Sequence, residues 1–399
     1  MPKKKKIPTE YDPNAYKEVR DLYLKGLEIA KTKDYDNLEL PEKTVRIDDL
    51  DTQSALQRLY DSIVPIVEHT LQTGRPEINV PSRSSGNIVW DEVNDLLLMG
   101  EKTSSKQLLT LTSTYDVTRL ARVMEIIHEL LQKDMHAKKR EVFYHDVNLF
   151  QDQRHSDGSI EDAAALMHAT RNSTHVVASA KGVAIGCLKI RDGTDIIDLE
   201  KQGKGGGWSI SPFLDDVEIL ETSAEFILVV EKDAAMSRLA EAKWYKKFPC
   251  IILTGKGMAD IATRMFLKRL SKLGLPVFVL VDADSYGFSI ASVFKQGSKK
   301  LSYESPFLAT QDVRLLGLLH RDLDAYNIPE EVRIPMTKAD IKKAKQLIKE
   351  EFIPDSWKKD LKGMIKDGNK AEIQALSSKG FEYLTEEYLP AKLSTGDWL

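Results

Sequence analysis

The feature that most constrains the fold is a series of apolar runs at residues 226–230, 251–253 and 277–281. Segments with helical patterning, at 234–245 and 259–273, separate these runs. Continuous apolar runs that alternate with helices are typical of a parallel sheet covered on both faces. The sequence therefore predicts an α/β domain built on a parallel sheet.

Acidic residues stand where these runs end. Glu231 directly follows the first run, and Asp282 and Asp284 follow the third. Ligands of parallel sheets bind beyond the carboxyl ends of the strands, so these carboxylates are expected at one edge of the sheet. Carboxylate oxygens are ligands that Mg²⁺ prefers, and we therefore predict a magnesium site formed by Glu231, Asp282 and Asp284. For Asp284 the alternative is that it caps the helix after the strand.

Lys256 stands between two glycines after the second run. Backbone amides and an ammonium in such a turn could bind a phosphate, which makes Lys256 a candidate DNA contact. The segment lacks the first glycine and the Ser or Thr of a Walker A loop, and no ATP-binding signature occurs elsewhere. Any dependence on ATP is therefore expected to come from another subunit.

Tyr144 follows a basic cluster formed by Lys138, Lys139 and Arg140. A free tyrosine has a pKa of about 10, so it attacks a phosphodiester only if nearby groups activate it. On a helix Arg140 would share a face with Tyr144, and the cluster would stabilise both a phenolate and the attacked phosphate. Tyr144 is therefore a candidate nucleophile assisted by Arg140, with Lys138 and Lys139 as candidate DNA contacts. Spacing alone favours the alternative, in which Phe143 and Tyr144 are half-buried aromatic packing.

The segments around Tyr144 have the order of a winged helix-turn-helix domain. Helical patterns are expected at 117–131, at 138–150 and, from a capping box at Ser159, to Arg171. A β-hairpin is expected over 176–190. Three helices followed by a hairpin are typical of a module that binds duplex DNA. A helical subdomain with a β-extension is the alternative.

The remaining segments lead to a division into three parts. Residues 1–70 are polar and charged, with weak helical patterning, and are expected to dock on a partner. Residues 71–190 would form the winged-helix domain, and 191–399 the parallel-sheet domain with C-terminal helices. Those helices are expected after Thr337, near 357–367 and over 371–388.

Charge and cysteine content restrict the partners and the compartment. The 399 residues carry a net charge of −4, so a DNA-binding surface must be local. Cys187 and Cys250 lie in apolar runs and are interpreted as buried, reduced thiols of a cytosolic protein. Without an apolar segment of spanning length, we expect no membrane association and a cytoplasmic, nucleoid-associated location.

Several motifs, taken together, resemble one family. Residues 140–153 resemble the nucleophile motif of one family, in Arg-Glu-Val-Phe-Tyr at 140–144, Leu-Phe at 149–150 and Asp-Gln at 152–153. This family comprises the A subunit of DNA topoisomerase VI and its relative, the meiotic double-strand-break transesterase. The Toprim domain of that family resembles Val-Val-Glu-Lys at 229–232, Thr-Gly-Lys-Gly at 254–257 and Leu-Val-Asp-Ala-Asp-Ser-Tyr-Gly at 280–287. Features of the tail, such as Leu-Ser-Tyr-Glu at 301–304, look like the archaeal branch.

The resemblance implies a type IIB topoisomerase cleavage subunit with a winged-helix domain and a Toprim domain. Tyr144 would become linked to the 5′ end of DNA, and Glu231 and Asp282, assisted by Asp284, would hold Mg²⁺. In this family the cleavage subunit is a homodimer, whose sites pair the tyrosine of one protomer with the metal site of the other. A separate B subunit, a GHKL ATPase, binds the ATP in an A2B2 complex. Phe143 stands where many members have a second tyrosine, which leaves Tyr144 to attack.

Two other functions are consistent with the sequence. A meiotic-type transesterase would use the same chemistry to break DNA without strand passage. A non-catalytic winged-helix protein would bind DNA and use its Toprim-like domain only as a scaffold.

Overall fold

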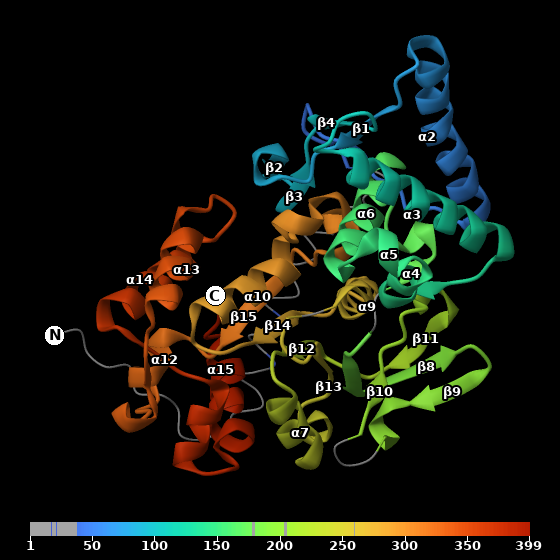
Figure 1. The fold of residues 1–399 in the computed structure, drawn as a ribbon. Helices are drawn as coiled ribbons and strands as arrows, with labels where there is room; N and C mark the ends of the chain where they lie inside the picture. Colours follow the sequence, from blue (N-terminus) through green and yellow to red (C-terminus); the bar gives the residue numbers. More distant parts are fainter. Residues whose placement is uncertain (1–16, 18–20, 22–37, 178–179, 203–205, 259) are drawn as a thin grey trace. The chain divides into compact units, whose positions relative to one another are not determined.

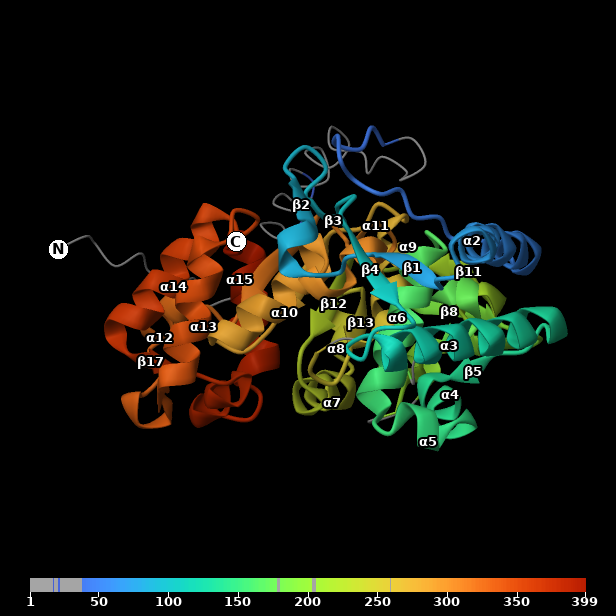
Figure 2. The ribbon, with the colours of Figure 1, turned by 45° about the horizontal axis from the view of Figure 1, so that its top comes forward.

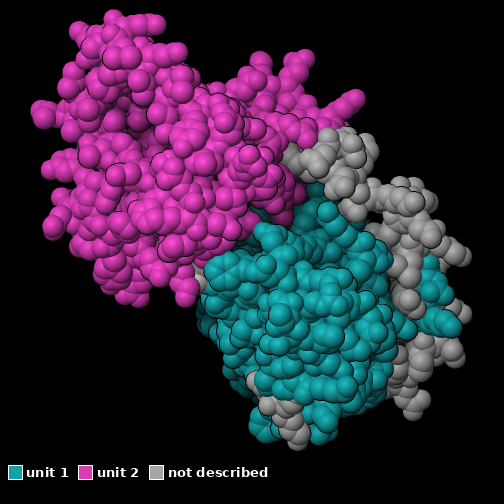
Figure 3. Space-filling model, turned by 90° about the vertical axis from the view of Figure 1, so that its right-hand side faces the viewer, with its two compact units in different colours: residues 1–34, 180–296, 308–399 teal, residues 35–179, 297–307 magenta. Residues whose placement is uncertain are grey.

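The computed structural model describes residues 17, 21, 38–177, 180–202, 206–258 and 260–399. The chain forms two compact units, which Figure 3 colours separately. Unit 1 comprises residues 1–34, 180–296 and 308–399, and unit 2 comprises residues 35–179 and 297–307. This division differs from the expected one, because 180–190 belong to unit 1 and the described residues 38–70 belong to unit 2. The rest of the N-terminal segment, with its lysine run, lies outside the described residues.

A mixed sheet forms the centre of unit 1. Its strand order is β10 (Trp208–Ser209), β7 (Val183–Gly186), β13 (Cys250–Thr254), β12 (Phe226–Val230), β14 (Val277–Leu280) and β15 (Val313–Gly317). The strands from β13 to β15 are parallel, whereas β7 and β10 are antiparallel to their neighbours. The predicted parallel sheet is therefore confirmed.

Both faces of this sheet are covered, which explains why its strands are continuously apolar. Phe226 and Leu228 point into one core, and Ile227 and Val229 point into the other. The first core includes side chains of α7 (Asp233–Glu241), α8 (Trp244–Lys247), α12 (His320–Ala325) and α15 (Leu389–Thr395). The second includes side chains of α9 (Ile261–Ser271), α10 (Ser285–Gln296), α13 (Lys338–Lys349) and α14 (Asp355–Asp367) (Figure 1).

The C-terminal segment follows the prediction in part. Thr337 caps α13 with a capping box, and Gly368 ends α14 in the left-handed conformation at φ 68°. The continuous helix expected over 371–388 is wrong. A 3₁₀ segment (Ile373–Lys379) and a π-helical turn (Leu384–Tyr388) lead into α15, in which Pro390 lies in the first turn, where a missing N–H is tolerated.

Smaller strands complete unit 1. An antiparallel sheet has the order β11 (Val217–Thr222), β8 (Leu188–Asp192) and β9 (Asp195–Asp198). The pair β16 (Ile334–Pro335) and β17 (Asn369–Lys370) joins the two ends of the α13–α14 segment. Cys187 and Cys250 are buried free thiols, as predicted, and burial raises the pKa of the Cys187 thiol to about 11.

Unit 2 is a helical body with short strands (Figure 2). Its helices are α2 (Thr52–Thr73), α3 (Thr114–Lys133), α4 (Lys139–His145), α5 (Val147–Phe150) and α6 (Gln153–Leu166). Its strand pairs are β1 (Glu77–Pro81) with β4 (Thr103–Gln107), β2 (Ile88–Asp91) with β3 (Leu96–Met99), and β5 (Ala137–Lys138) with β6 (Val176–Val177). The chain passes from unit 2 to unit 1 within another short helix, α11 (Ser305–Leu308), after residue 307.

Two expectations for this region are wrong. The third helix begins at Gln153, because Asp152 caps it by accepting from the Arg154 N–H, and Ser159 lies inside the helix. The hairpin over 176–190 does not form, because β6 pairs in parallel with β5 whereas β7 pairs with β13 in the sheet of unit 1. The winged-helix assignment therefore stays a prediction, now supported by the helices alone.

Within the described residues, no helix is both long enough and apolar enough to cross a membrane.

Candidate active site

Tyr144 projects from the outer face of α4, and its side chain is 59% exposed. Arg140, one turn earlier, donates a long hydrogen bond of 3.5 Å from Nη2 to the phenol oxygen. Its guanidinium carbon lies 5.8 Å from the centre of the Tyr144 ring. Phe143 packs partly buried against the core of unit 2. Of these neighbouring aromatics, Tyr144 is therefore the one presented to an incoming ligand, and Arg140 is placed to stabilise its phenolate.

The neighbouring lysines have different surroundings. Lys138 is exposed, and its backbone N–H donates to the Glu141 carboxylate. The ammonium of Lys139 instead forms an ion pair with Asp157 at 2.8 Å, and its side chain is only 17% exposed. Lys138 therefore has an ammonium available for a phosphate, whereas that of Lys139 is already engaged.

The predicted carboxylates of unit 1 meet at the sheet edge, because β12 and β14 are hydrogen-bonded neighbours in parallel register. The Glu231 carboxylate accepts a 2.9 Å hydrogen bond from the backbone N–H of Asp282. The Asp282 carboxylate accepts one of 2.8 Å from the backbone N–H of Ile373. The structure therefore brings Glu231 and Asp282 into direct contact at the place that the sequence pattern predicted.

The electrostatics of this edge suit a cation. Burial, together with the charges of Asp282 and Asp284, raises the pKa of Glu231 to about 7. Burial also raises the pKa values of Asp282 and Asp284 above their ordinary value. Carboxylates that disfavour one another's ionisation would be stabilised by a bound cation, and their oxygens are the donors that Mg²⁺ prefers. The donor atoms at this edge are therefore of the kind that Mg²⁺ binds.

Asp284 caps the helix that follows β14, which is the alternative role considered for it. Its carboxylate accepts a 2.7 Å hydrogen bond from the backbone N–H of Gly287, in the first turn of α10. A side chain that accepts a helix N–H in this way satisfies a donor that the helix itself leaves unpaired. One carboxylate oxygen is thus engaged locally.

Lys232 and Glu372 belong to this site and were not predicted. The Lys232 ammonium lies 2.8 Å from an oxygen of Asp282 and 2.9 Å from one of Glu372. Although burial lowers the pKa of Lys232, these hydrogen bonds outweigh it and raise that pKa. Among the described residues, no three acidic, His or Cys side chains form a ready-made metal site. In this structure Lys232 is the cation that Asp282 contacts.

The local sequence contained only part of the information needed to place Lys232 and Glu372 at this site. Lys232 directly follows Glu231, but adjacency does not show where its ammonium points. Glu372 reaches the site because Ala371 pairs with Ala283, a contact between residues far apart in the chain.

The Thr254–Gly257 turn borders the same edge. The Gly257 N–H donates to the Glu231 carbonyl at 2.7 Å, and Lys256 adopts the left-handed region at φ 52°. The Lys256 ammonium lies 3.4 Å from the exposed Asp233 carboxylate, a contact that water and salt weaken. Lys256 thus keeps a largely accessible ammonium in a turn that contacts the Glu231 backbone.

The predicted residues are divided between the units. Lys138, Lys139, Arg140 and Tyr144 belong to unit 2. The other set, which belongs to unit 1, consists of Glu231, Lys256, Asp282 and Asp284.

Comparison with known proteins adds independent information. The family model for the Toprim domain of the topoisomerase 6 A chain and Spo11 matches residues 226–393, and one described as "Type IIB DNA topoisomerase" matches residues 115–176. The chain is 44% identical over 354 residues to the A3 chain of DNA topoisomerase 6 from Oryza sativa subsp. indica, with 88% of this chain and 80% of the relative covered.

More distant relatives cover similar shares of the chain. The A chain of type 2 DNA topoisomerase 6 from Hyperthermus butylicus is 34% identical over 387 residues, which cover 90% of this chain and 100% of the relative. Meiotic recombination protein SPO11 of Mus musculus is 34% identical over 371 residues, which cover 90% and 92%.

Proposed function

Because the chain belongs to the family of type IIB topoisomerase cleavage subunits and Spo11 proteins, we propose that it cleaves and rejoins DNA as the A subunit of topoisomerase VI. The predicted family and Toprim domain are confirmed. The relatives named above include a plant protein at 44% identity and an archaeal one at 34%, so the archaeal branch is not confirmed. The observation that carries the proposed chemistry is the exposed phenol of Tyr144 beside Arg140.

The proposed reaction is a transesterification. The Tyr144 oxygen attacks a backbone phosphorus and loses its proton, and Arg140 stabilises the negative charge that develops. The new bond joins this oxygen to the 5′-phosphate, while the bond to the 3′ oxygen breaks and that oxygen takes up a proton. The reverse reaction reseals the strand. Since one phosphodiester bond replaces another, resealing needs no ATP.

Glu231 and Asp282, with Asp284 assisting, are the residues that would hold Mg²⁺. A bound Mg²⁺ would polarise a phosphoryl oxygen and stabilise the leaving 3′ oxygen. For Asp282 to become a ligand, Lys232 has to leave its oxygen, and Glu372 already provides a second carboxylate for that ammonium. Lys138 and Lys256, whose ammonium groups are accessible, would contact the DNA backbone.

Partner binding is proposed for the outer stripe of α2, which we define as Tyr60, Val64, Val67 and Leu71. The inner face of α2 packs into the core of unit 2 and Tyr60 also hydrogen-bonds His128 of α3, but the side chains of the outer stripe are 40–81% exposed. Its spacing of four, three and four residues is that of a helix seam that packs on another helix. We assign this surface to the ATP-binding B subunit, in a complex of two A and two B chains. The two A chains would form the homodimer that the family resemblance implies.

Trapping of a covalent complex tests the proposed chemistry. The chain, mixed with a B subunit, ATP, Mg²⁺ and supercoiled plasmid, is denatured rapidly so that a protein–DNA adduct persists. Wild type is expected to form this adduct, and Tyr144→Phe is expected to form none while it still binds DNA. Adduct formation by Tyr144→Phe, or its absence from wild type, would contradict the proposal.

The likeness to Meiotic recombination protein SPO11 supports a second candidate, a transesterase that breaks DNA without strand passage. Relaxation of the plasmid in the same mixture separates the two functions. A topoisomerase reseals and yields relaxed circles, whereas a break-forming enzyme accumulates linear DNA.

A further inference from the structure

A set of ion pairs in unit 2 connects the helix that carries Tyr144 to α6 and to residues 297–307. We call it the Glu161 cluster, and it consists of Arg83, Lys106, Lys139, Asp157, Glu161, Asp162 and Lys300. The side chain of Glu161 is only 3% exposed. A carboxylate this deeply buried is unfavourable unless cations and hydrogen bonds compensate it. The cluster therefore surrounds a buried carboxylate, whereas ordinary surface ion pairs join side chains that water already solvates.

Lys139 joins α4 to this cluster. Its ammonium lies 2.8 Å from an oxygen of Asp157 and 3.7 Å from one of Glu161. Asp157 and Glu161 are four residues apart on α6, so both carboxylates face the same ammonium. Arg83 holds Glu161 in turn, with Nη1 at 2.6 Å. The first residue of α4 is thus anchored to a carboxylate pair that is itself held in place.

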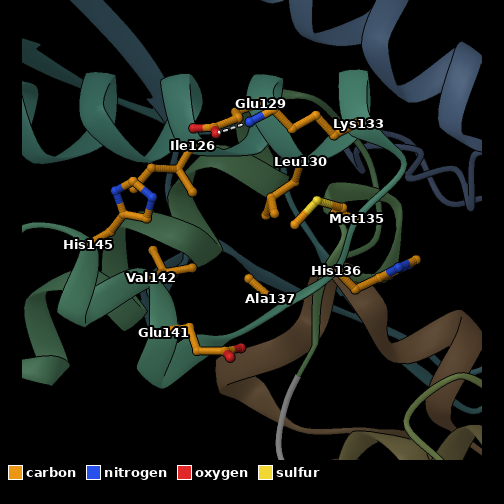
Figure 4. Close-up of a pocket in the computed structure, with 10 residues that line it drawn as sticks. All are labelled: Ile126, Glu129, Leu130, Lys133, Met135, His136, Ala137, Glu141, Val142 and His145. Carbon is orange, nitrogen blue, oxygen red and sulfur yellow. Dashed lines mark hydrogen bonds and ion pairs between the residues drawn. The ribbon is translucent and has the colours of Figure 1, made fainter.

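A cavity borders α4 away from these ion pairs. A cavity of about 220 Å³ lies between α3 and α4, and Glu141, Val142 and His145 of α4 line it (Figure 4). Close packing normally determines where a helix lies, and an open space removes part of that restraint. Val142 still packs into the core of unit 2, so the contacts of Lys139 add an electrostatic restraint at the N-terminal end of α4.

Residues 297–307 bring a further cation to the cluster. They follow α10 in sequence, yet they pack within unit 2, where Tyr303 is buried beside Met99 and Ala164. The Lys300 ammonium lies 3.4 Å from the same Glu161 oxygen that Lys139 approaches. This segment therefore contributes to the electrostatic balance around Glu161.

We propose that Lys139 is a positioning residue for Tyr144. Its ammonium, held by Asp157 and Glu161, sets the position of α4 and thereby the direction from which the phenol reaches a phosphorus atom. In this role Lys139 contacts no DNA, which replaces the expectation from sequence that it binds phosphate. The inference rests on the proposed cleavage function.

The test separates the rate of chemistry from DNA affinity. In the complex with a B subunit, adduct formation is measured in a single turnover at saturating DNA, and affinity is measured by fluorescence anisotropy. Lys139→Met is expected to slow adduct formation by about 100-fold, the scale on which a displacement of about 1 Å slows enzymes, while affinity changes by less than about twofold. Lys139→Arg, which keeps the ion pair, is expected to restore most of the rate.

Neighbouring lysines provide contrasting controls. Lys138→Met removes an exposed ammonium and is expected to weaken DNA binding. Lys133→Met, on α3, removes an exposed pair with Glu129 at the edge of the cavity, outside the Glu161 cluster, and is expected to change neither quantity. A loss of affinity by Lys139→Met with an unchanged saturating rate would show that Lys139 binds DNA and would overturn the inference.

A second measurement, which does not depend on catalysis, tests the positioning role if Lys139→Met proves unstable. Hydrogen exchange of the α4 amides is expected to accelerate in Asp157→Asn, while the α3 amides keep their protection. Equal acceleration in both helices, or none, would overturn the positioning role. An adduct missing from wild type and Lys133→Met alike would instead refute the proposed function.

Discussion

The backbone amide of Asp282 donates a 2.9 Å hydrogen bond to the carboxylate of Glu231, which joins the ends of β12 and β14. This bond brings together acidic residues that are 51 positions apart in the sequence. It also leaves the Asp282 carboxylate to interact with Lys232 and with the Ile373 amide. Proposed metal ligands are thus oriented by backbone amides, one just after β14 and one in the 3₁₀ segment that begins at Ile373.

Glu231→Gln tests the metal site with little structural change, because the amide oxygen can still accept from the Asp282 N–H. Mg²⁺-dependent adduct formation is expected to fall by about two orders of magnitude, the scale on which enzymes slow when they lose an electrostatic stabiliser of the transition state. DNA affinity, measured by anisotropy, should stay near that of wild type. Glu241→Gln on α7, an exposed residue paired with Arg238, is the control. Wild-type cleavage by Glu231→Gln would remove Glu231 from the site.

Charge substitutions in the outer stripe of α2 test partner binding. Val64→Asp or Leu71→Glu is expected to weaken the complex with a B subunit by about tenfold or more, since binding would bury a carboxylate that has no partner. The thermal stability of this chain without its partner should change little, because both side chains are exposed. Titration calorimetry measures the affinity, with Glu68→Gln on the same helix as control. Unchanged affinity in both variants would place the B subunit elsewhere.

Lys392→Met is expected to destabilise unit 1. The Lys392 side chain is fully buried, with its ammonium 3.2 Å from Asp322 and 2.9 Å from Asp397. Removing one partner of a buried pair leaves an uncompensated charge and commonly costs about 3–5 kcal/mol. Urea unfolding at neutral pH measures this loss.

The loss in Lys392→Met should shrink as the pH falls. Burial raises the pKa of Asp322 and Lys392 opposes that rise, so the folded-state pKa becomes higher still in the variant. An unfolded Asp has a pKa of about 3.9, so between this value and the folded pKa the folded state binds more protons. The difference in unfolding free energy between wild type and Lys392→Met therefore becomes smaller as the pH falls through the pKa that Asp322 has in the folded variant. A difference that is the same at neutral and at mildly acidic pH would contradict this.

DNA affinity should decrease steeply as the salt concentration rises, because phosphate contacts release counterions. Lys138→Ala and Lys256→Ala are each expected to lower the slope of log affinity against log salt by about 0.9. Anisotropy titrations between about 50 and about 200 mM salt provide the slopes. An unaltered slope would show that the substituted lysine contacts no phosphate.

Sequence patterns alone predicted the carboxylate edge and the Arg140–Tyr144 pair, because both depend on local rules. Parallel strands end at a common edge of their sheet, and helical residues four apart share a face. The capping box at Thr337 is local in the same sense. The Arg140–Tyr144 pair and the cap follow from the geometry of a single helix, and the carboxylate edge follows from the rule that parallel strands end together.

Only the tertiary structure decided which strands pair and which lysines are available. β7 joins β13 instead of turning back onto β6, and Glu372 meets Lys232 through a contact between distant segments. Lys138 and Lys139 are adjacent in sequence, yet one is exposed and the other is paired with Asp157. Local periodicity determines whether a segment forms a helix or a strand. Which strand it pairs with, and which of its side chains become buried, depends on contacts with segments that are distant in the sequence.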